Sequence, residues 1–202
     1  DKEAVKTLAA ELQGQLREEY TGSDENISIE IAELGETSVQ VLHPTSQEKV
    51  LFYLMNVPFG IQKMSGTISG LVETSSNIGI LKLEEEELFA SSSVRSSVDA
   101  ACTALSEKLE YLTEFLGGEY EVLGAYPAWE YRKESPLRDK MVAVYEEMYG
   151  KKPEVVAIHA GLECGLFYKK MEGLDCVSLG PDMKDIHTSE ELLDIASTER
   201  VW

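Results

Sequence analysis

Apolar and polar residues alternate with a period of two between about residues 67 and 97, and from Val98 the apolar residues recur at helical spacing. The alternation predicts two strands, near 78–84 and 87–96, which flank an acidic turn and form an antiparallel hairpin. The helical spacing predicts a helix over 98–116 that ends at Gly117-Gly118. A helix that follows a hairpin in this way favours an α+β sandwich, with helices on one face of an antiparallel sheet.

The segments before this hairpin also carry periodic patterns. Spacing of apolar residues predicts an amphipathic helix over about 2–20 and a short helix over 45–56, after Pro44. Alternation predicts strands over 27–32 and 39–42. A further strand is expected at about 119–124, directly after the helix 98–116 in the sequence.

The character of the sequence changes near 125–134, where we expect a domain boundary. Ser135-Pro136 is an N-cap followed by proline at the first helical position, which predicts a helix over 136–149. The run 154–159 is almost continuously apolar and is typical of a buried parallel strand, and 176–179 has the same character. With a short helix from about residue 161 and a last helical turn capped by Ser189, this part predicts an α/β arrangement.

The composition excludes several functions. The 202 residues include 18 Lys and Arg against 37 Asp and Glu, a formal net charge of -19 that would repel a phosphate backbone, so we expect no nucleic-acid partner. Apolar runs are too short to cross a bilayer, so we expect no membrane partner. Three cysteines without CxxC spacing argue against a disulfide framework and a cysteine zinc site, and fit the cytoplasm. A start at Asp1, without methionine or signal peptide, suggests a processed or truncated chain.

Few residues could carry chemistry, because the sequence has no GxSxG elbow, no glycine-rich phosphate loop and no HExxH helix. His43 precedes a proline at a helix entrance and is interpreted as a surface residue. His159 is interpreted as a satisfied structural histidine, although active sites also gather at the ends of parallel strands. His187 lies in a polar loop and is a candidate metal ligand or catalytic group. Glu163, at a helix start after a buried strand, either complements the helix dipole or serves a site.

Several stretches, in the same order and over nearly the whole chain, resemble the aminoacyl-histidine dipeptidases (peptidase D, Xaa-His dipeptidases, carnosinase-like zinc peptidases). The strongest runs from His159 to Phe167, with the sequence HAGLECGLF. The others are VETSSNIG at 72–79, VRS at 94–96, YPAW at 126–129, VSLGP at 177–181 and HTSEE at 187–191.

The resemblance implies an α/β catalytic domain that binds two zinc ions and a smaller inserted lid domain that mediates dimerisation. Residues 1–125 would be most of the lid, and 126–202 the last part of the catalytic domain. His187 matches a histidine that ligates one zinc, and Glu163 matches an acid that supports the site. Asn77 and Arg95 match lid positions expected to hold the substrate carboxylate or the oxyanion. The parent protein would be a cytoplasmic homodimer that hydrolyses Xaa-His dipeptides through a metal-activated water.

The rest of the family's metal site is missing from this sequence. No histidine is followed two residues later by aspartate, and the Glu-Glu pairs at 18–19, 146–147 and 190–191 lack the surroundings of the general base. We therefore expect a C-terminal piece of such an enzyme that is inactive by itself, because one histidine does not complete a catalytic zinc site.

Two other interpretations stay open. The chain could be a non-catalytic dimerisation or ligand-binding module derived from a dipeptidase. A gene that continues upstream of Asp1 with a His-x-Asp motif would favour the enzyme, and a gene that starts there would favour the module. An unrelated small hydrolase would need a nucleophile that the sequence does not offer.

Overall fold

The structure is a computed structural model that describes residues 1–24, 26–159 and 161–202. It divides into two compact units, Asp1–His43 and Pro44–Trp202. The boundary predicted between a lid domain (1–125) and a catalytic domain (126–202) differs from this division into units. That domain assignment stays a prediction. No helix of the described residues is long and apolar enough to span a membrane.

The first unit contains one helix, α1 (Lys2–Glu19), as predicted for residues 2–20. Asp1 caps it by accepting a hydrogen bond from the backbone N–H of Glu3 at 3.1 Å. The strands predicted over 27–32 and 39–42 are wrong, because both segments lack secondary structure. The backbone of 27–29 pairs with side chains of α1 instead of a second strand: Arg17 Nε donates to the Ile27 carbonyl, and the Ile29 N–H donates to Gln13 Oε1.

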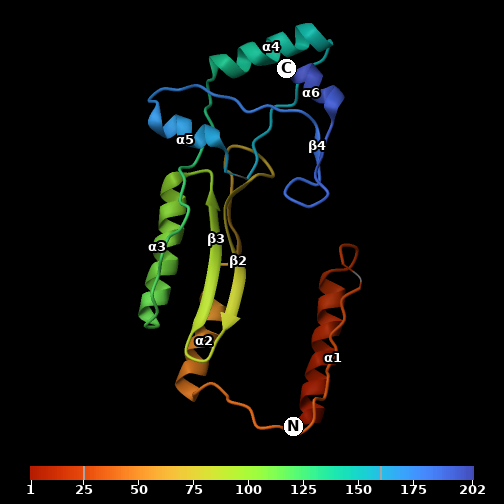
Figure 1. The fold of residues 1–202 in the computed structure, drawn as a ribbon, viewed down its shortest axis with the longest axis vertical. Coiled ribbons are helices and arrows are strands. Elements are labelled where there is room, and N and C mark those ends of the chain that lie inside the picture. Colours follow the sequence, from red (N-terminus) through yellow and green to blue (C-terminus); the bar gives the residue numbers. More distant parts are fainter. Residues whose placement is uncertain (25, 160) are drawn as a thin grey trace. The chain divides into compact units, whose positions relative to one another are not determined.

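The second unit is built on a three-stranded antiparallel sheet in the order β1-β2-β3; Figure 1 labels β2 and β3, which run side by side. Strand β2 (Val72–Leu83) and strand β3 (Leu88–Ser96) form the predicted hairpin, and β2 begins six residues earlier than the predicted strand. The register shifts between Ile78 and Ile80, so a bulge forms around Gly79. Strand β1 (Gly60–Met64) was not predicted, because its short Gly-Ile-Gln-Lys-Met sequence becomes a strand only by pairing with β2.

Two helices cover one face of this sheet. Helix α2 (Pro44–Asn56) directs Tyr53 to a hydrogen bond with Ser92 of β3. Helix α3 (Asp99–Phe115) packs beside β3 and buries Leu105 and Leu109, which are 7% and 3% exposed. Gly117 ends α3 at a φ of +85°, a conformation that glycine adopts without strain. The prediction of an α+β fold with helices on one sheet face is therefore confirmed.

Residues after α3 form helices, one pair of two-residue strands and irregular segments joined by side-chain hydrogen bonds. The predicted helix 136–149 is present with these bounds, but the strands predicted over 119–124, 154–159 and 176–179 are wrong. A parallel strand needs a neighbour for its ladder hydrogen bonds, and no described segment runs beside 154–159 as one. The last helix starts after Asp194, not Ser189, and Asp194 Oδ1 accepts from the Ser197 N–H at 2.6 Å. The elements are α4 (Pro136–Tyr149), α5 (Glu163–Lys170), β4 (Met183–Lys184), β5 (Leu192–Leu193) and α6 (Ile195–Val201).

Leu109 offers a test of the packing between α3 and the sheet. We expect Leu109→Ala to lower the free energy of unfolding of the second unit by about 2–5 kcal/mol, because it leaves a cavity in a small apolar core. Urea unfolding followed by circular dichroism measures the change. The matched control is Leu123→Ala at a site that is 79% exposed, where the expected change is within about 0.5 kcal/mol. Equal effects at the two sites would contradict this packing.

Asp175 offers a test of the link between α4 and the end of α5. Its carboxylate accepts from the Leu137 N–H at 2.9 Å and from the Ser135 hydroxyl at 2.7 Å, and these bonds, with Arg132 and Arg138 nearby, lower the pKa of Asp175. A lowered folded-state pKa stabilises the fold above the unfolded-state pKa, and the contribution disappears as the pH falls through the folded-state pKa.

We therefore expect Asp175→Asn to be less stable than the parent chain at neutral pH, with a difference that vanishes in strong acid. Unfolding at a series of pH values measures this. Glu172→Gln removes the same charge from an exposed neighbour and should show no such pH dependence. A stability difference for Asp175→Asn that persists unchanged in acid would contradict the carboxylate's role.

Candidate functional site

The face of the sheet opposite α2 and α3 carries the predicted substrate-binding residues. Ser75 of β2 lies directly across from Arg95 of β3, and Asn77 lies across from Ser93. Residues directly opposite each other share a face, and residues two apart on one strand do too, so Ser75, Asn77 and Arg95 all point to this open face. Asn77 and Arg95 are exposed, which leaves both side chains available to a ligand.

His159 joins this open face from a distant part of the chain. Its Nε2 lies 2.7 Å from Ser75 Oγ, and the ring also hydrogen-bonds the backbone of Val72. Partial burial and the positive charge of Arg95 lower the pKa of His159 below its ordinary value, so the ring is neutral near neutral pH. The interpretation of His159 as a histidine with satisfied hydrogen bonds agrees with this geometry, and the structure adds that it sits beside Arg95.

Gly161 and Gly165 lie against the motif at 126–129. Gly165 is buried, and a Cβ at this position would lie 2.7 Å from the carbonyl oxygen of Pro127. A Cβ at Gly161 would collide with the ring of Tyr126. Glycine is therefore needed at 165 because the Pro127 backbone approaches closely, whereas at 161 the near neighbour is the exposed Tyr126 ring, which can move aside. Glu163, the first residue of α5, is exposed between them.

His187 lies in the loop between β4 and β5, which is closed by its own hydrogen bonds. The Thr188 hydroxyl donates to the Asp185 carbonyl at 2.7 Å, and the His187 backbone N–H donates to Glu191 Oε2 at 2.9 Å. Asp185 and His187 adopt positive φ angles of 51° and 67°. This conformation is strained for residues other than glycine, and such strain clusters at functional sites. The loop thereby presents an exposed imidazole.

The described residues do not assemble a metal centre. Across residues 1–24, 26–159 and 161–202, no group of three or more His, Cys, Asp or Glu side chains is arranged to hold a metal ion. The imidazole of His187 suits zinc as one ligand, but a catalytic zinc needs three protein ligands. His187 therefore fits a single position of a metal site and cannot hold the ion alone.

The structure brings together some of the predicted site residues and not others. Asn77, Arg95 and His159 meet on the open face, whereas no hydrogen bond or ion pair within the described part of the chain joins them to Glu163 or His187. His43 is exposed, immediately before α2. Sequence reasoning missed Ser75 as a contact of His159, because the two residues are 84 positions apart and no local pattern couples them.

Titration can test whether the positive charge of Arg95 lowers the pKa of His159. We expect Arg95→Met to raise the pKa of His159 toward its ordinary value, because a nearby positive charge that disfavours the imidazolium is removed. NMR titration of the three histidine side chains measures the shift, and His159→Asn identifies the signal. The control is Arg132→Met, which removes an arginine that donates hydrogen bonds to the carbonyl oxygens of Gly173 and Leu174. It should leave the pKa of His159 unchanged. An unchanged pKa in Arg95→Met would contradict the placement of Arg95 beside His159.

Comparison with known proteins finds that the chain is similar to part of two dipeptidases. No family model matches it. It is 28% identical over 200 residues to the cytosol non-specific dipeptidase of Escherichia coli (strain K12), a match that covers 99% of this chain and 41% of that protein. The crystal structure of aminoacylhistidine dipeptidase from Vibrio alginolyticus matches with a TM-score of 0.85 and 32% identity, over 99% of this chain and 41% of that one.

The chain thus spans about two fifths of the length of the relatives it matches. The likeness extends along nearly the whole of this chain in both sequence and structure. The chain is therefore similar along nearly its whole length to part of two dipeptidases, one of them an aminoacylhistidine dipeptidase, as the motifs indicated.

Proposed function

We propose that this chain supplies part of the active site of a zinc-dependent dipeptidase that hydrolyses Xaa-His dipeptides. The observation that carries the proposal is the likeness to two dipeptidases along 99% of the chain. In this proposal His187 is one metal ligand and Glu163 supports the metal site. Asn77 and Arg95 bind the substrate carboxylate or the tetrahedral oxyanion.

The open face of the hairpin supports the substrate-binding part of the proposal. Arg95 is exposed there, and its planar guanidinium pairs with a carboxylate through two parallel hydrogen bonds. Asn77 offers an amide N–H₂ on the same face, which can donate to a carboxylate or an oxyanion. Because partial burial and the positive charge of Arg95 lower the pKa of His159, the imidazole adds no second positive charge near neutral pH.

The loop of His187 supports the metal-binding part. An exposed imidazole on a short hydrogen-bonded loop can serve as a zinc donor. A bound zinc would polarise the scissile carbonyl and ionise a water molecule. The remaining ligands and the general base would come from residues outside this chain, so the chain by itself would be inactive.

We also propose a homodimer and a cytosolic location. Strand β3 is an edge of the described sheet, and an antiparallel edge can pair with a second copy. The word "cytosol" in the name of the E. coli relative supports the location.

The second candidate function is a non-catalytic ligand-binding or dimerisation module. The absence of a three-ligand cluster from the described residues favours it, while the open face with Asn77 and Arg95 could still bind a dipeptide. The two candidates differ in whether this chain supports turnover when the rest of a dipeptidase is present.

The first experiment uses the 202-residue chain itself. We expect no hydrolysis of an Ala-His dipeptide with or without zinc, and weak zinc binding by calorimetry that disappears in His187→Ala. His43→Ala is the matched control, because His43 is also exposed, and it should leave the weak binding unchanged. Turnover by the chain alone, or tight stoichiometric zinc binding, would show that a complete site exists within these residues.

A second experiment tests the positive part of the proposal. A chimera in which this chain replaces the matching two fifths of the E. coli dipeptidase should hydrolyse dipeptides. His187→Ala in the chimera should lower kcat/KM by about 10²-fold or more, because a metal ligand is lost. Arg95→Met should mainly raise KM, with Arg95→Lys between the two. A folded chimera that binds dipeptide without turnover would favour the non-catalytic module.

A further inference from the structure

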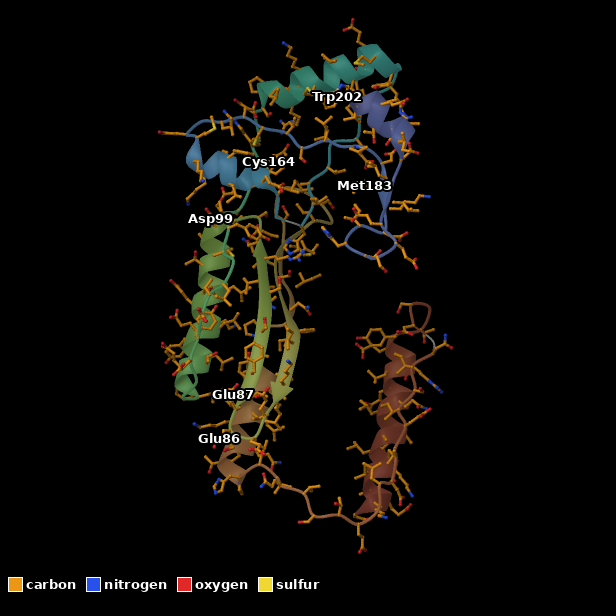
Figure 2. All side chains as sticks on the ribbon, in the orientation of Figure 1. Glu86, Glu87, Asp99, Cys164, Met183 and Trp202 are labelled. Carbon is orange, nitrogen blue, oxygen red and sulfur yellow. The ribbon has the colours of Figure 1, made fainter. Side chains whose placement is uncertain are left out.

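Two of the three cysteines lie side by side where α5 begins. Cys164 is in the first turn of α5, where Figure 2 labels it, and Cys176 follows the end of the same helix by six residues. The Cys176 thiol donates to the Cys164 carbonyl oxygen across 4.0 Å, and the two thiols hydrogen-bond each other. Both are half-buried and reduced.

Contacts from three segments hold the pair in place. Next to Cys176, Asp175 is anchored by the Ser135 hydroxyl at 2.7 Å and by the Leu137 N–H at the start of α4. Next to Cys164, Gly165 is buried against the Pro127 carbonyl. The side chain of Trp129 hydrogen-bonds Cys176. Hydrogen bonds and close packing of their neighbours therefore hold the Cys176 thiol beside the Cys164 backbone without a covalent bond.

The remaining cysteine serves as an internal comparison. Cys102 lies in α3 and is also half-buried. Among the described residues, no contact joins its thiol to another cysteine. Burial and the negative charge of Asp99 raise the pKa of Cys102.

We propose that Cys164 and Cys176 form a reversible intramolecular disulfide, which makes this corner of the fold a redox-sensitive modification site. The oxidant is a small disulfide, and glutathione disulfide serves as the probe. The proposal concerns the thiols alone and does not depend on the proposed dipeptidase function.

The exchange proceeds in two balanced steps. The Cys164 thiolate attacks one sulfur of the oxidant, which forms a mixed disulfide and releases one glutathione thiolate. The Cys176 thiolate then attacks Cys164 Sγ, which forms the protein disulfide and releases the second glutathione. The two protein thiols lose two electrons, the oxidant gains them, and the protons go to the two glutathione thiolates.

The surroundings of Cys176 set the expected pH dependence. Burial, the neighbouring Cys164 and the charge of Asp175 raise the pKa of the Cys176 thiol, although Trp129 opposes this. The groups that face Cys176 are therefore Cys164 on α5, Asp175 on its own segment and Trp129 from 126–129. Because the thiolate is the nucleophile, ring closure should accelerate as the pH rises.

Oxidation would change the neighbourhood of Glu163. The disulfide would tie the first turn of α5 to the segment before 177–181, with residues 165–175 between the two cysteines. Glu163 precedes Cys164, so its backbone would lose freedom when the bond forms.

The experiment treats the purified chain with glutathione disulfide at pH 7 and at pH 8.5, followed by alkylation, thiol counting and mass spectrometry of the tryptic peptides. We expect the chain to lose two of its three reactive thiols, faster at the higher pH. Trypsin cleaves after Lys169 and Lys170, so the disulfide should join peptide 152–169 to peptide 171–184. Dithiothreitol should restore all three thiols, which separates a disulfide from irreversible oxidation.

Three variants test which of the cysteines form the disulfide. Cys102→Ser should form the same cross-link at the same rate. Cys164→Ser and Cys176→Ser should stop at a glutathione adduct. A cross-link that contains Cys102, a bond between two chains, glutathione adducts without the cross-linked peptide, or three unreacted thiols at pH 8.5 would each overturn the proposal.

Discussion

The antiparallel pairing of β2 with β3 is the constraint on which the second unit depends, because it gives the chain a sheet with two unlike faces. One face is covered by α2 and α3, with Leu105 and Leu109 buried between helix and strands. The other face is left open and carries Ser75, Asn77 and Arg95. A shift of the register by one residue would exchange these faces, so the same pairing that buries the core also presents the candidate substrate-binding residues.

A small set of long-range polar contacts attaches the later segments to this framework. Ser75 meets His159 on the open face, and Asp99 at the start of α3 accepts a hydrogen bond from the Ala128 N–H at 2.7 Å. Asp175 in turn joins the end of α5 to the start of α4. The packing supplies few apolar contacts here, since Val155, Val156 and Ile158 are each more than half exposed. Individual hydrogen bonds therefore determine where the motif residues of this part lie.

The sequence anticipated those elements whose stabilising interactions are local. Helices α1 and α4 start at Asp1 and Ser135 because each cap residue accepts a backbone N–H a few positions along the chain. The hairpin followed from alternation on both sides of one turn. The strand over 154–159 failed because an apolar run specifies burial but not a partner, and a strand exists only when a neighbour completes its hydrogen bonds. Strand β1 was missed for the converse reason. Its own sequence carries no strand pattern, and only pairing with β2 makes it a strand.

The candidate site also combines features that the sequence encodes locally with features that depend on tertiary contacts. The sequence by itself determined the likeness to dipeptidases, because motifs are properties of the order of residues. It also predicted candidate roles for Asn77, Arg95, Glu163 and His187, which stay predictions. Only the tertiary structure decided that His159 lies against Ser75 beside Arg95, that Cys164 lies against Cys176, and that His187 adopts a strained left-handed conformation. These features depend on contacts between residues far apart in the chain or on the closure of a loop, and no local pattern of side chains encodes them.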